Sequence, residues 1–208
     1  MNPAQFPIRA FQPGDEAAVY DVCLKTGDAG HDATHLYSDP KALGHFFVGP
    51  YMRLEPELAF VLTDESGVCG YALGALDSQR FYARCSIDWL PDLQKIHPLP
   101  EGDPARWTLT QRMHHRYHRP DFCYPDFFHA YPSHLHIDLL PHAQGIGNGT
   151  RMMNRLLDAL RGRGSPGVHL SMAGSNHRAE KFYKKLGFTE LARVESGGLQ
   201  SLYLGMPL

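Results

Sequence analysis

The last third of the chain alternates between short hydrophobic runs and helical patterns, and this order constrains the fold more than any other feature. A strand pattern at 134–140, a helix pattern at 149–161, a strand pattern at 168–172 and a helix pattern at 177–186 follow one another. Gly187 ends the second helix. Two strands joined by a helix pair in parallel through a right-handed crossover. We therefore predict an α/β fold.

The rest of the chain makes the predicted sheet mixed. The patterns indicate a strand at 6–11, a helix from Pro13 to Gly27, a short helix from Asp39-Pro40 that includes Phe46 and Phe47, a hairpin across 58–76, and closing strands near 188–194 and 200–206. Residues 77–132 are rich in Pro, His and aromatic residues, which is typical of an insertion, with short helices expected at 88–96 and 106–118. We predict one domain, 1–208, with helices flanking a mixed central sheet.

Composition excludes several classes of protein. With 43% hydrophobic and 20% charged residues the chain is typical of a globular protein. A net charge of −2 gives no overall electrostatic reason to expect nucleic acid or an acidic membrane as partner. The N-terminal sequence lacks a signal-peptide pattern, no hydrophobic run could span a bilayer, and the four cysteines are scattered. We therefore expect reduced thiols and a cytoplasmic location.

The loop QGIGNGTRMM, from Gln144 to Met153, stands directly before the first of these helices. The loop does not fit a dinucleotide fingerprint, because Thr150 stands where the third glycine of that motif is required. It does not fit a P-loop either, because it lacks the lysine of that motif. Small residues at a helix start can still bind an anion, because backbone N–H groups and the helix dipole converge there. Taken alone, the loop fits a phosphate site or a plain tight turn.

A second motif resolves this choice. The segment SNHRAEKFYKKLGF begins with Asn176, a suitable N-cap, and carries apolar residues along one helical stripe. Together with the glycine loop it resembles the GNAT family of acetyl-CoA-dependent N-acetyltransferases. The first family motif, Q/R-x-x-G-x-G/A, matches Gln144, Gly147 and Gly149. The later N-x-x-A-x-x-F-Y-x-K-L-G-F pattern matches residues 176–188.

This resemblance implies the GNAT fold, with a splayed parallel strand pair that admits acetyl-CoA and with a backbone N–H near Leu139 facing the acetyl oxygen. It implies no metal. The cofactor-binding residues that it implies are Leu139, Leu140, Gln144, Gly145, Ile146, Gly147, Asn148, Gly149, Thr150, Asn176, Ala179, Phe182, Tyr183 and Lys185.

A narrower resemblance covers most of the chain. PGDEAAVYDVCLKTGDAG, YMRLEPELAFVLTDESGVCGYALGALD and SIDWLPDLQ look like the acetyltransferase-like domain at the C-terminus of O-GlcNAcase and its stand-alone bacterial relatives. That domain in animals is widely regarded as a pseudo-acetyltransferase. The resemblance thus implies either transfer of an acetyl group to a primary amine by direct attack in a ternary complex, or a module that binds acetyl-CoA or a protein partner without turnover. The intact glycine motif favours the enzyme.

Three residues are candidates for catalysis. Tyr183 matches the family's general acid, since a phenol is protonated at neutral pH and can donate to a thiolate; otherwise it is a packed helix aromatic. Alternation along 134–140 places His134, His136 and Asp138 on one face. Asp138 matches an acidic position proposed as catalytic in the O-GlcNAcase-like relatives and could accept the amine proton, with His136 as relay.

Other interpretations of these residues stay open. The histidines and Asp138 could equally form a hydrogen-bonded structural cluster, and Glu55 and Glu57 are reserve bases. His114 and His118 lie at i and i+4, but no further ligand completes a metal site in the sequence, so we expect none.

The acceptor itself cannot be named from the sequence. The aromatic residues of 77–132 fit a cap over the acceptor cleft, a homodimer surface or the insertion's own core. Protein lysines and small amines both remain candidate acceptors.

Overall fold

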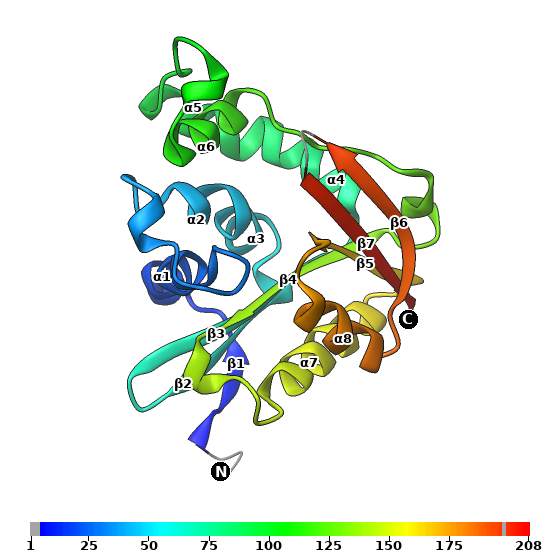
Figure 1. Ribbon diagram of the computed structural model, residues 1–208. Coiled ribbons are helices and arrows are strands. Elements are labelled where there is room, and N and C mark those ends of the chain that lie inside the picture. Colours follow the sequence, from blue (N-terminus) through cyan, green and yellow to red (C-terminus); the bar gives the residue numbers. More distant parts are fainter. Residues whose placement is uncertain (1–4, 197–198) are drawn as a thin grey trace.

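Seven strands form one mixed sheet in the order β1-β2-β3-β4-β5-β7-β6 (Figure 1). The computed structural model describes residues 5–196 and 199–208. The strands are β1 (Ile8–Ala10), β2 (Ala59–Asp64), β3 (Gly67–Ala75), β4 (Ser133–Leu139), β5 (Gly167–Ala173), β6 (Thr189–Ser196) and β7 (Leu199–Pro207). Strands β4 and β5 pair in parallel, whereas the other neighbours are antiparallel. The predicted mixed α/β sheet with a central parallel pair is confirmed.

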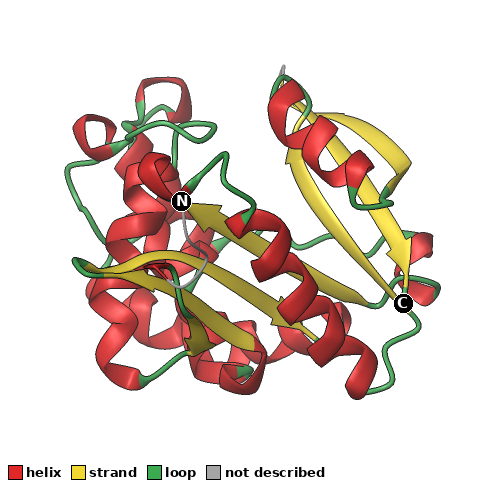
Figure 2. Ribbon diagram, turned by 90° about the horizontal axis from the view of Figure 1, so that it is seen from below, coloured by secondary structure: helices red, strands yellow, loops and turns green. Residues whose placement is uncertain are grey.

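Helices cover both faces of the sheet (Figure 2). The α-helices are α1 (Glu16–Thr26), α2 (Ala42–Phe47), α3 (Gly49–Leu54), α4 (Ser78–Arg84), α5 (Leu90–Ile96), α6 (Leu109–His118), α7 (Asn148–Gly162) and α8 (His177–Lys185). The shorter turns are 3₁₀ segments η2 (Pro13–Asp15), η3 (Thr34–Leu36), η4 (Pro56–Leu58), η6 (Pro104–Arg106), η7 (Asp126–His129) and η8 (Pro141–Ala143), and one π-helical turn, η5 (Cys85–Trp89).

Strand alternation divides the interior into two main cores. Leu135 and Leu139 of β4 face α7, whose Met152, Met153 and Leu156 are fully buried. The opposite face of β2 and β3 packs against α1, α2 and α3. Successive side chains of a strand point to opposite faces, so the polar residues of β4 must lie on the α1–α3 side. This arrangement places them beneath the 77–132 segment.

The 77–132 segment is largely helical. The predicted helices near 88–96 and 106–118 are confirmed as α5 and α6, with slightly later starts. The sequence analysis did not predict α4, although Asp77 caps it by accepting a hydrogen bond from Arg80 N at 2.8 Å. In Figure 1 the three helices lie beside α2 and α3 at one end of the sheet.

Part of this segment forms a small core of its own. Leu90, Leu93 and Tyr117 are buried together, and the Trp89 ring packs against them. The Trp89 indole N–H donates to the carbonyl of His45 at 2.7 Å, which fastens the segment to α2.

The predicted reduced cysteines are consistent with the free thiols of the four residues. No described helix has both the length and the hydrophobicity that a membrane crossing requires.

Candidate active site

The parallel pair β4–β5 opens along its length. Its two paired positions are Ser133 with Val168 and His134 with His169, although β4 continues to Leu139 and β5 to Ala173. Beyond these positions the two halves of the sheet diverge, as Figure 2 shows. This divergence is the splayed strand pair that the sequence analysis predicted.

Backbone groups of β4 face into this opening. The N–H of Leu140 bonds to the carbonyl of Cys69 on the β3 side at 2.8 Å. Because backbone polar groups alternate in direction along a strand, those of Leu139 and Ile137 face the β5 side. The carbonyl of Leu140 also accepts a bond, from Ala143 N at 2.9 Å. The N–H of Leu139 is thus better placed than that of Leu140 to meet a ligand, and Ile137, which the sequence analysis did not name as a cofactor-binding residue, joins it.

The glycine loop follows β4 and η8 directly. Gly145 and Gly147 have φ values of +75° and +89°, and Gly147 is the N-cap of α7. Such left-handed backbone favours glycine. A Cβ at Gly149 would lie 3.2 Å from the Phe182 ring, so this glycine allows α7 and α8 to approach. At each of these three positions, therefore, a larger residue would strain the backbone or crowd a neighbouring ring.

The loop presents backbone N–H donors, and two of its side chains make hydrogen bonds to neighbouring backbone carbonyls. The amide of Gln144 donates to the carbonyl of Leu139 at 2.6 Å. The buried Asn148 amide donates to the carbonyl of Ala143 at 3.1 Å and its oxygen accepts from Arg151. The first N–H groups of α7 have no partner within the helix, and the dipole makes this end positive. Gly145, Ile146, Gly147 and Thr150 are exposed and Gly149 is partly exposed, whereas Asn148 is buried, so an anion can approach the loop and the start of α7 from solvent.

Helix α8 carries the second predicted motif. The side-chain oxygen of Asn176 accepts from Ala179 N at 3.0 Å, which confirms the predicted N-cap. Ala179 and Phe182 are half-buried against the main core, whereas Lys185 is exposed. Tyr183 is buried between the rings of Phe182 and Phe188. The motif therefore orients one buried phenol toward the sheet.

The phenol of Tyr183 stays protonated near neutral pH. Its burial, together with the charge of Asp138, raises the pKa well above the ordinary tyrosine value. Burial and the charge of Asp138 are the causes of this shift, and no hydrogen bond from the described residues contributes to it. A protonated phenol is what a general acid requires.

Asp138 lies in a network that joins three parts of the chain. Tyr71, its direct cross-strand partner on β3, donates to Asp138 Oδ2 at 2.7 Å. His136 Nε2 lies 3.1 Å from the same oxygen, and His136 Nδ1 donates to the carbonyl of Phe47 at 3.0 Å. Sequence reasoning did not name Tyr71, because the cross-strand pairing that identifies it is not visible in one strand alone.

His136 favours the charged form. Burial opposes protonation, but the hydrogen bond and charge of Asp138 and the bond to the Phe47 carbonyl outweigh it and raise the His136 pKa. Both ring nitrogens then donate. Asp138 Oδ2 accepts hydrogen bonds from Tyr71 and His136, whereas Oδ1 has no hydrogen-bond partner among the described residues.

The third member of the predicted polar row behaves differently. His134 is buried and its Nδ1 lies 2.7 Å from the Ser78 hydroxyl, while its Nε2 has no partner in the described parts of the chain. Burial holds the His134 pKa well below the ordinary value. Burial also lowers the pKa of His169, opposite it on β5, to about 4. The row thus divides into His136, whose pKa is raised beside Asp138, and His134, whose pKa is lowered by burial.

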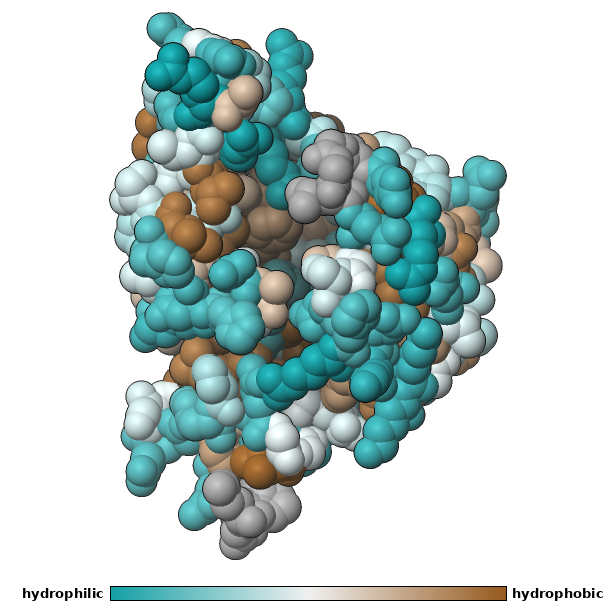
Figure 3. Space-filling view, viewed as in Figure 1, coloured by the Kyte–Doolittle hydropathy of each residue, from teal (hydrophilic) through white to brown (hydrophobic). Residues whose placement is uncertain are grey.

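A cavity of about 350 Å³ adjoins this polar face. The space-filling view has a hollow near its centre, with hydrophobic residues gathered beside it (Figure 3). The sheet contributes His134, His136, His169 and Tyr203, α2 contributes Phe46 and Phe47, and residues 77–132 contribute Phe81, Tyr82, Arg116, Phe122 and Phe128. The Arg116 guanidinium lies 4.3 Å from the centre of the Phe46 ring. The 77–132 segment therefore lines this cavity in addition to forming its own core.

The reserve bases lie elsewhere. Glu55 is 3.8 Å from Arg84 and Glu57 is 3.6 Å from Arg163, in ion pairs. Neither of them, nor Asp138, is among the residues that line the cavity, but Asp138 contacts His136, which does line it. The structure brings Asp138, not these glutamates, to the polar face beside the opening.

Known proteins resemble this chain in sequence and in fold. The model of the acetyltransferase (GNAT) family matches residues 107–188. Protein O-GlcNAcase of Rattus norvegicus is 32% identical over 204 residues, which cover 98% of this chain and 22% of that protein. The chain thus spans about a fifth of the length of this curated relative.

Solved structures extend the likeness to the fold. The crystal structure of SsHAT has a TM-score of 0.88 and 42% identity, with 98% of each chain covered. The structure of yncA from Salmonella typhimurium with its cofactor acetyl-CoA has a TM-score of 0.56 at 16% identity, covering 98% of this chain and 94% of that one, and supports the fold alone.

Proposed function

Because the chain belongs to the acetyltransferase (GNAT) family, we propose that it transfers the acetyl group of acetyl-CoA to a primary amine. One observation carries this proposal. The β4–β5 opening is followed, after β4, by the glycine-capped start of α7, and the carboxylate of Asp138 and the buried phenol of Tyr183 lie near it. A thioester donor needs these features together.

The donor would bind mainly through the backbone. The pyrophosphate would lie at the first N–H groups of α7, which Gly147 and Gly149 leave accessible. The pantetheine arm would enter the opening and pair with the backbone groups of Ile137 and Leu139. The N–H of Leu139 is the oxyanion donor that this placement favours.

The chemistry would proceed in a ternary complex. The neutral amine attacks the acetyl carbonyl, so that the N–C bond forms and the carbonyl oxygen becomes an oxyanion. Asp138 Oδ1, which Tyr71 and His136 leave free, accepts the proton that the amine loses. The C–S bond then breaks, and Tyr183 donates its proton to the thiolate of CoA. The products are an amide and CoA.

The acceptor would enter through the cavity beneath residues 77–132. Its walls are aromatic, and its floor carries His136 next to Asp138. In this proposal the 77–132 segment acts as a cap over the acceptor. His136 is a positioning residue, because its ring is held between the Phe47 carbonyl and Asp138.

Calorimetry with acetyl-CoA, followed by assays of thiol release over a panel of protein and small-molecule amines, tests the proposal. We expect one saturable site and amine-dependent release of CoA. Tight binding with no release over a broad panel would favour the alternative, a module that binds acetyl-CoA without turnover. Absence of binding would refute both functions.

A further inference from the structure

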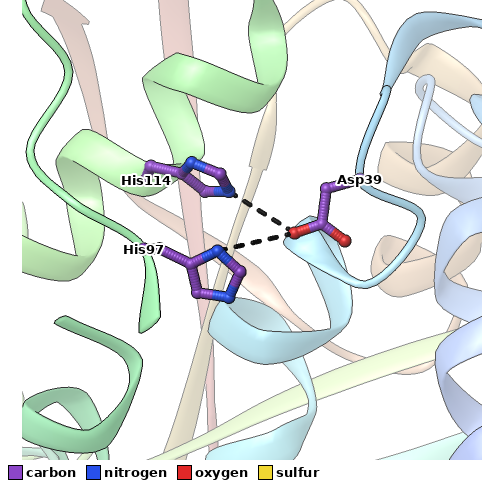
Figure 4. A group of neighbouring side chains, drawn as sticks. All are labelled: Asp39, His97 and His114. Atoms are coloured by element: carbon purple, nitrogen blue, oxygen red, sulfur yellow. Dashed lines mark hydrogen bonds and ion pairs between the residues drawn. The ribbon is translucent and has the colours of Figure 1, made fainter. Parts of the chain in front are cut away.

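A cluster of three metal-ligating side chains lies outside the candidate active site. Figure 4 shows His97 and His114 turned toward one carboxylate oxygen of Asp39. His114 Nε2 lies 3.4 Å and His97 Nδ1 lies 4.0 Å from Asp39 Oδ2. Each of the three side chains is about one fifth exposed. We propose that Asp39, His97 and His114 bind a divalent transition metal, with Zn²⁺ as the best-suited ion.

The spacing supports a tetrahedral ion. Two ligand atoms bound to Zn²⁺ at ~2.0–2.1 Å in tetrahedral geometry lie about 3.4 Å apart. The separation between Asp39 and His114 equals this value, and the separation between Asp39 and His97 exceeds it by only roughly half an ångström. A small rotation of the His97 side chain closes that difference. Two imidazoles and a carboxylate are a donor set typical of Zn²⁺ with one position left for water.

A second group of potential metal ligands, Asp64, Cys69 and His142, is less suited to bind an ion. His142 Nε2 lies 2.7 Å from Asp64 Oδ2, in direct hydrogen-bond contact that leaves no room for an ion. The third member, Cys69, donates its thiol to the carbonyl of Leu62. The Asp39 cluster is more widely spaced, since the hydrogen bond between His114 Nε2 and Asp39 Oδ2 is 3.4 Å long and His97 Nδ1 lies 4.0 Å from the same oxygen.

One face of α6 fixes the ligands. Thr110 accepts a hydrogen bond from Ser38 N at 2.9 Å and so holds the residue before Asp39. One turn further on is His114, and one turn beyond it His118 donates to the carbonyl of His97 at 2.8 Å. The i, i+4 histidines of this helix therefore divide their roles, one as ligand and the other as support. Outer hydrogen bonds of this kind orient metal ligands.

The carboxylate is also oriented from its own side. Asp39 Oδ1 accepts from Lys41 N at 2.9 Å, which turns Oδ2 toward the histidines. Within the described residues, Asp39 has ion-pair contacts only with these two imidazoles. The ring of His45 lies 5.6 Å from that of His97, and its buried Nδ1 has no partner in the same described residues.

The metal would join parts of the chain that are distant in sequence. Asp39 precedes α2, whereas His97 and His114 belong to the 77–132 segment. Two residues after His114, the Arg116 guanidinium covers the Phe46 and Phe47 rings at the cavity. The ion would therefore stabilise the position of the cap and has no part in acetyl transfer.

Titration calorimetry of the tag-free, chelator-treated chain with Zn²⁺ tests the proposal. We expect one equivalent to bind, and Asp39→Asn and His114→Gln to weaken binding by at least about tenfold each. The matched controls are His115→Gln, on the same helix, and His142→Gln, in the second cluster, and both should bind as the wild type does. The absence of saturable binding, or loss in His142→Gln alone, would overturn the proposal.

Two further measurements keep the test decisive. Co²⁺ bound to the wild type should give the intense visible absorption of a four-coordinate site, and weak octahedral bands would contradict the assignment whatever the variants do. Acetyl-CoA affinity should be the same in Asp39→Asn as in the wild type. Failure of the metal site is thereby distinguished from failure of the acetyltransferase proposal.

Discussion

The cofactor side and the acceptor side of the candidate active site are made from different parts of the polypeptide. On the cofactor side, backbone groups of β4 and of the α7 start face the opening, and two continuous motifs supply them. On the acceptor side, side chains from α2, from the sheet and from residues 77–132 meet around one cavity. Backbone recognition leaves a local glycine pattern in the sequence, whereas a cavity lined by distant side chains leaves none.

The largest expected effect separates chemistry from cofactor binding. Asp138→Asn keeps the size and the bonds of the side chain but removes the base, so the turnover rate should fall by roughly 10²–10⁴-fold. Acetyl-CoA affinity, measured by calorimetry, should not change. The control is Asp158→Asn, an exposed position on α7. Equal turnover in the two variants would remove Asp138 from the mechanism, and lost cofactor affinity would break the division between the two sides.

The neutral histidine on the cavity wall predicts a sensitivity to acid. The pKa of His169 is about 4 in the folded state, below the ordinary value near 6.5, so the unfolded chain binds more protons between these values. The contribution of His169 is therefore fully present above about pH 6.5, and up to about 3 kcal/mol of it is lost as the pH falls toward 4.

Denaturant unfolding at pH 7 and at pH 5 measures this effect. In His169→Gln the loss of stability between these two pH values should be smaller than in the wild type. His136, whose pKa is raised, has the opposite sign: its contribution is present below the unfolded-state pKa and is lost as the pH rises through the higher folded-state value. An unchanged pH slope in His169→Gln would show that this imidazole is not held neutral.

The glycine loop tests the backbone side of the comparison. Gly147→Val places a branched side chain at a φ of +89°, which costs about 1–2 kcal/mol and displaces the α7 start. We expect weaker acetyl-CoA binding by calorimetry and a lower midpoint of thermal unfolding. The matched control is Gly162→Ala at the other end of α7, where a Cβ meets open space. If both variants bound the cofactor equally, backbone geometry at Gly147 would not matter for binding.

The smallest expected effect concerns the acceptor side alone. Arg116→Ala removes a guanidinium that covers the Phe46 and Phe47 rings, an interaction worth roughly 0.5–1 kcal/mol. The kcat/KM for the amine should decrease a few-fold, while the acetyl-CoA affinity stays constant. The exposed Arg161 on α7 provides the control substitution to Ala. A change in cofactor affinity in Arg116→Ala would show that the two sides are coupled.

Much of the fold could be predicted because its signals are local. The hairpin around Glu65–Gly67, the cap at Asn176 and the stop at Gly187 each depend on a few neighbouring residues, and the structure has all three. Helix α4 was missed because its seven residues carry only two aromatic residues, Phe81 and Tyr82, which are adjacent and so show no apolar period.

The candidate site could be predicted only in part, for the same reason. Alternation along β4 placed His136 and Asp138 on one face, but it did not reveal Tyr71, which reaches Asp138 across the sheet. The i, i+4 spacing of His114 and His118 fits a metal pair, but the sequence shows no third ligand, and we therefore expected no metal site from it. The structure instead turns His114 toward Asp39 and His97, and His118 toward a carbonyl.

The sequence by itself determined the order of elements and the glycine turn before a helix, since hydrophobic period, glycine and helix caps act over a few residues. The splayed strand pair and the cofactor role of that turn followed from the family resemblance of two local motifs. The tertiary structure alone decided that the pKa of His136 is raised and that of His134 is lowered, because burial and hydrogen-bond partners set each pKa. It also decided how the cavity and the Asp39 cluster are assembled, since both join residues that only the packed sheet and its inserted helices bring together.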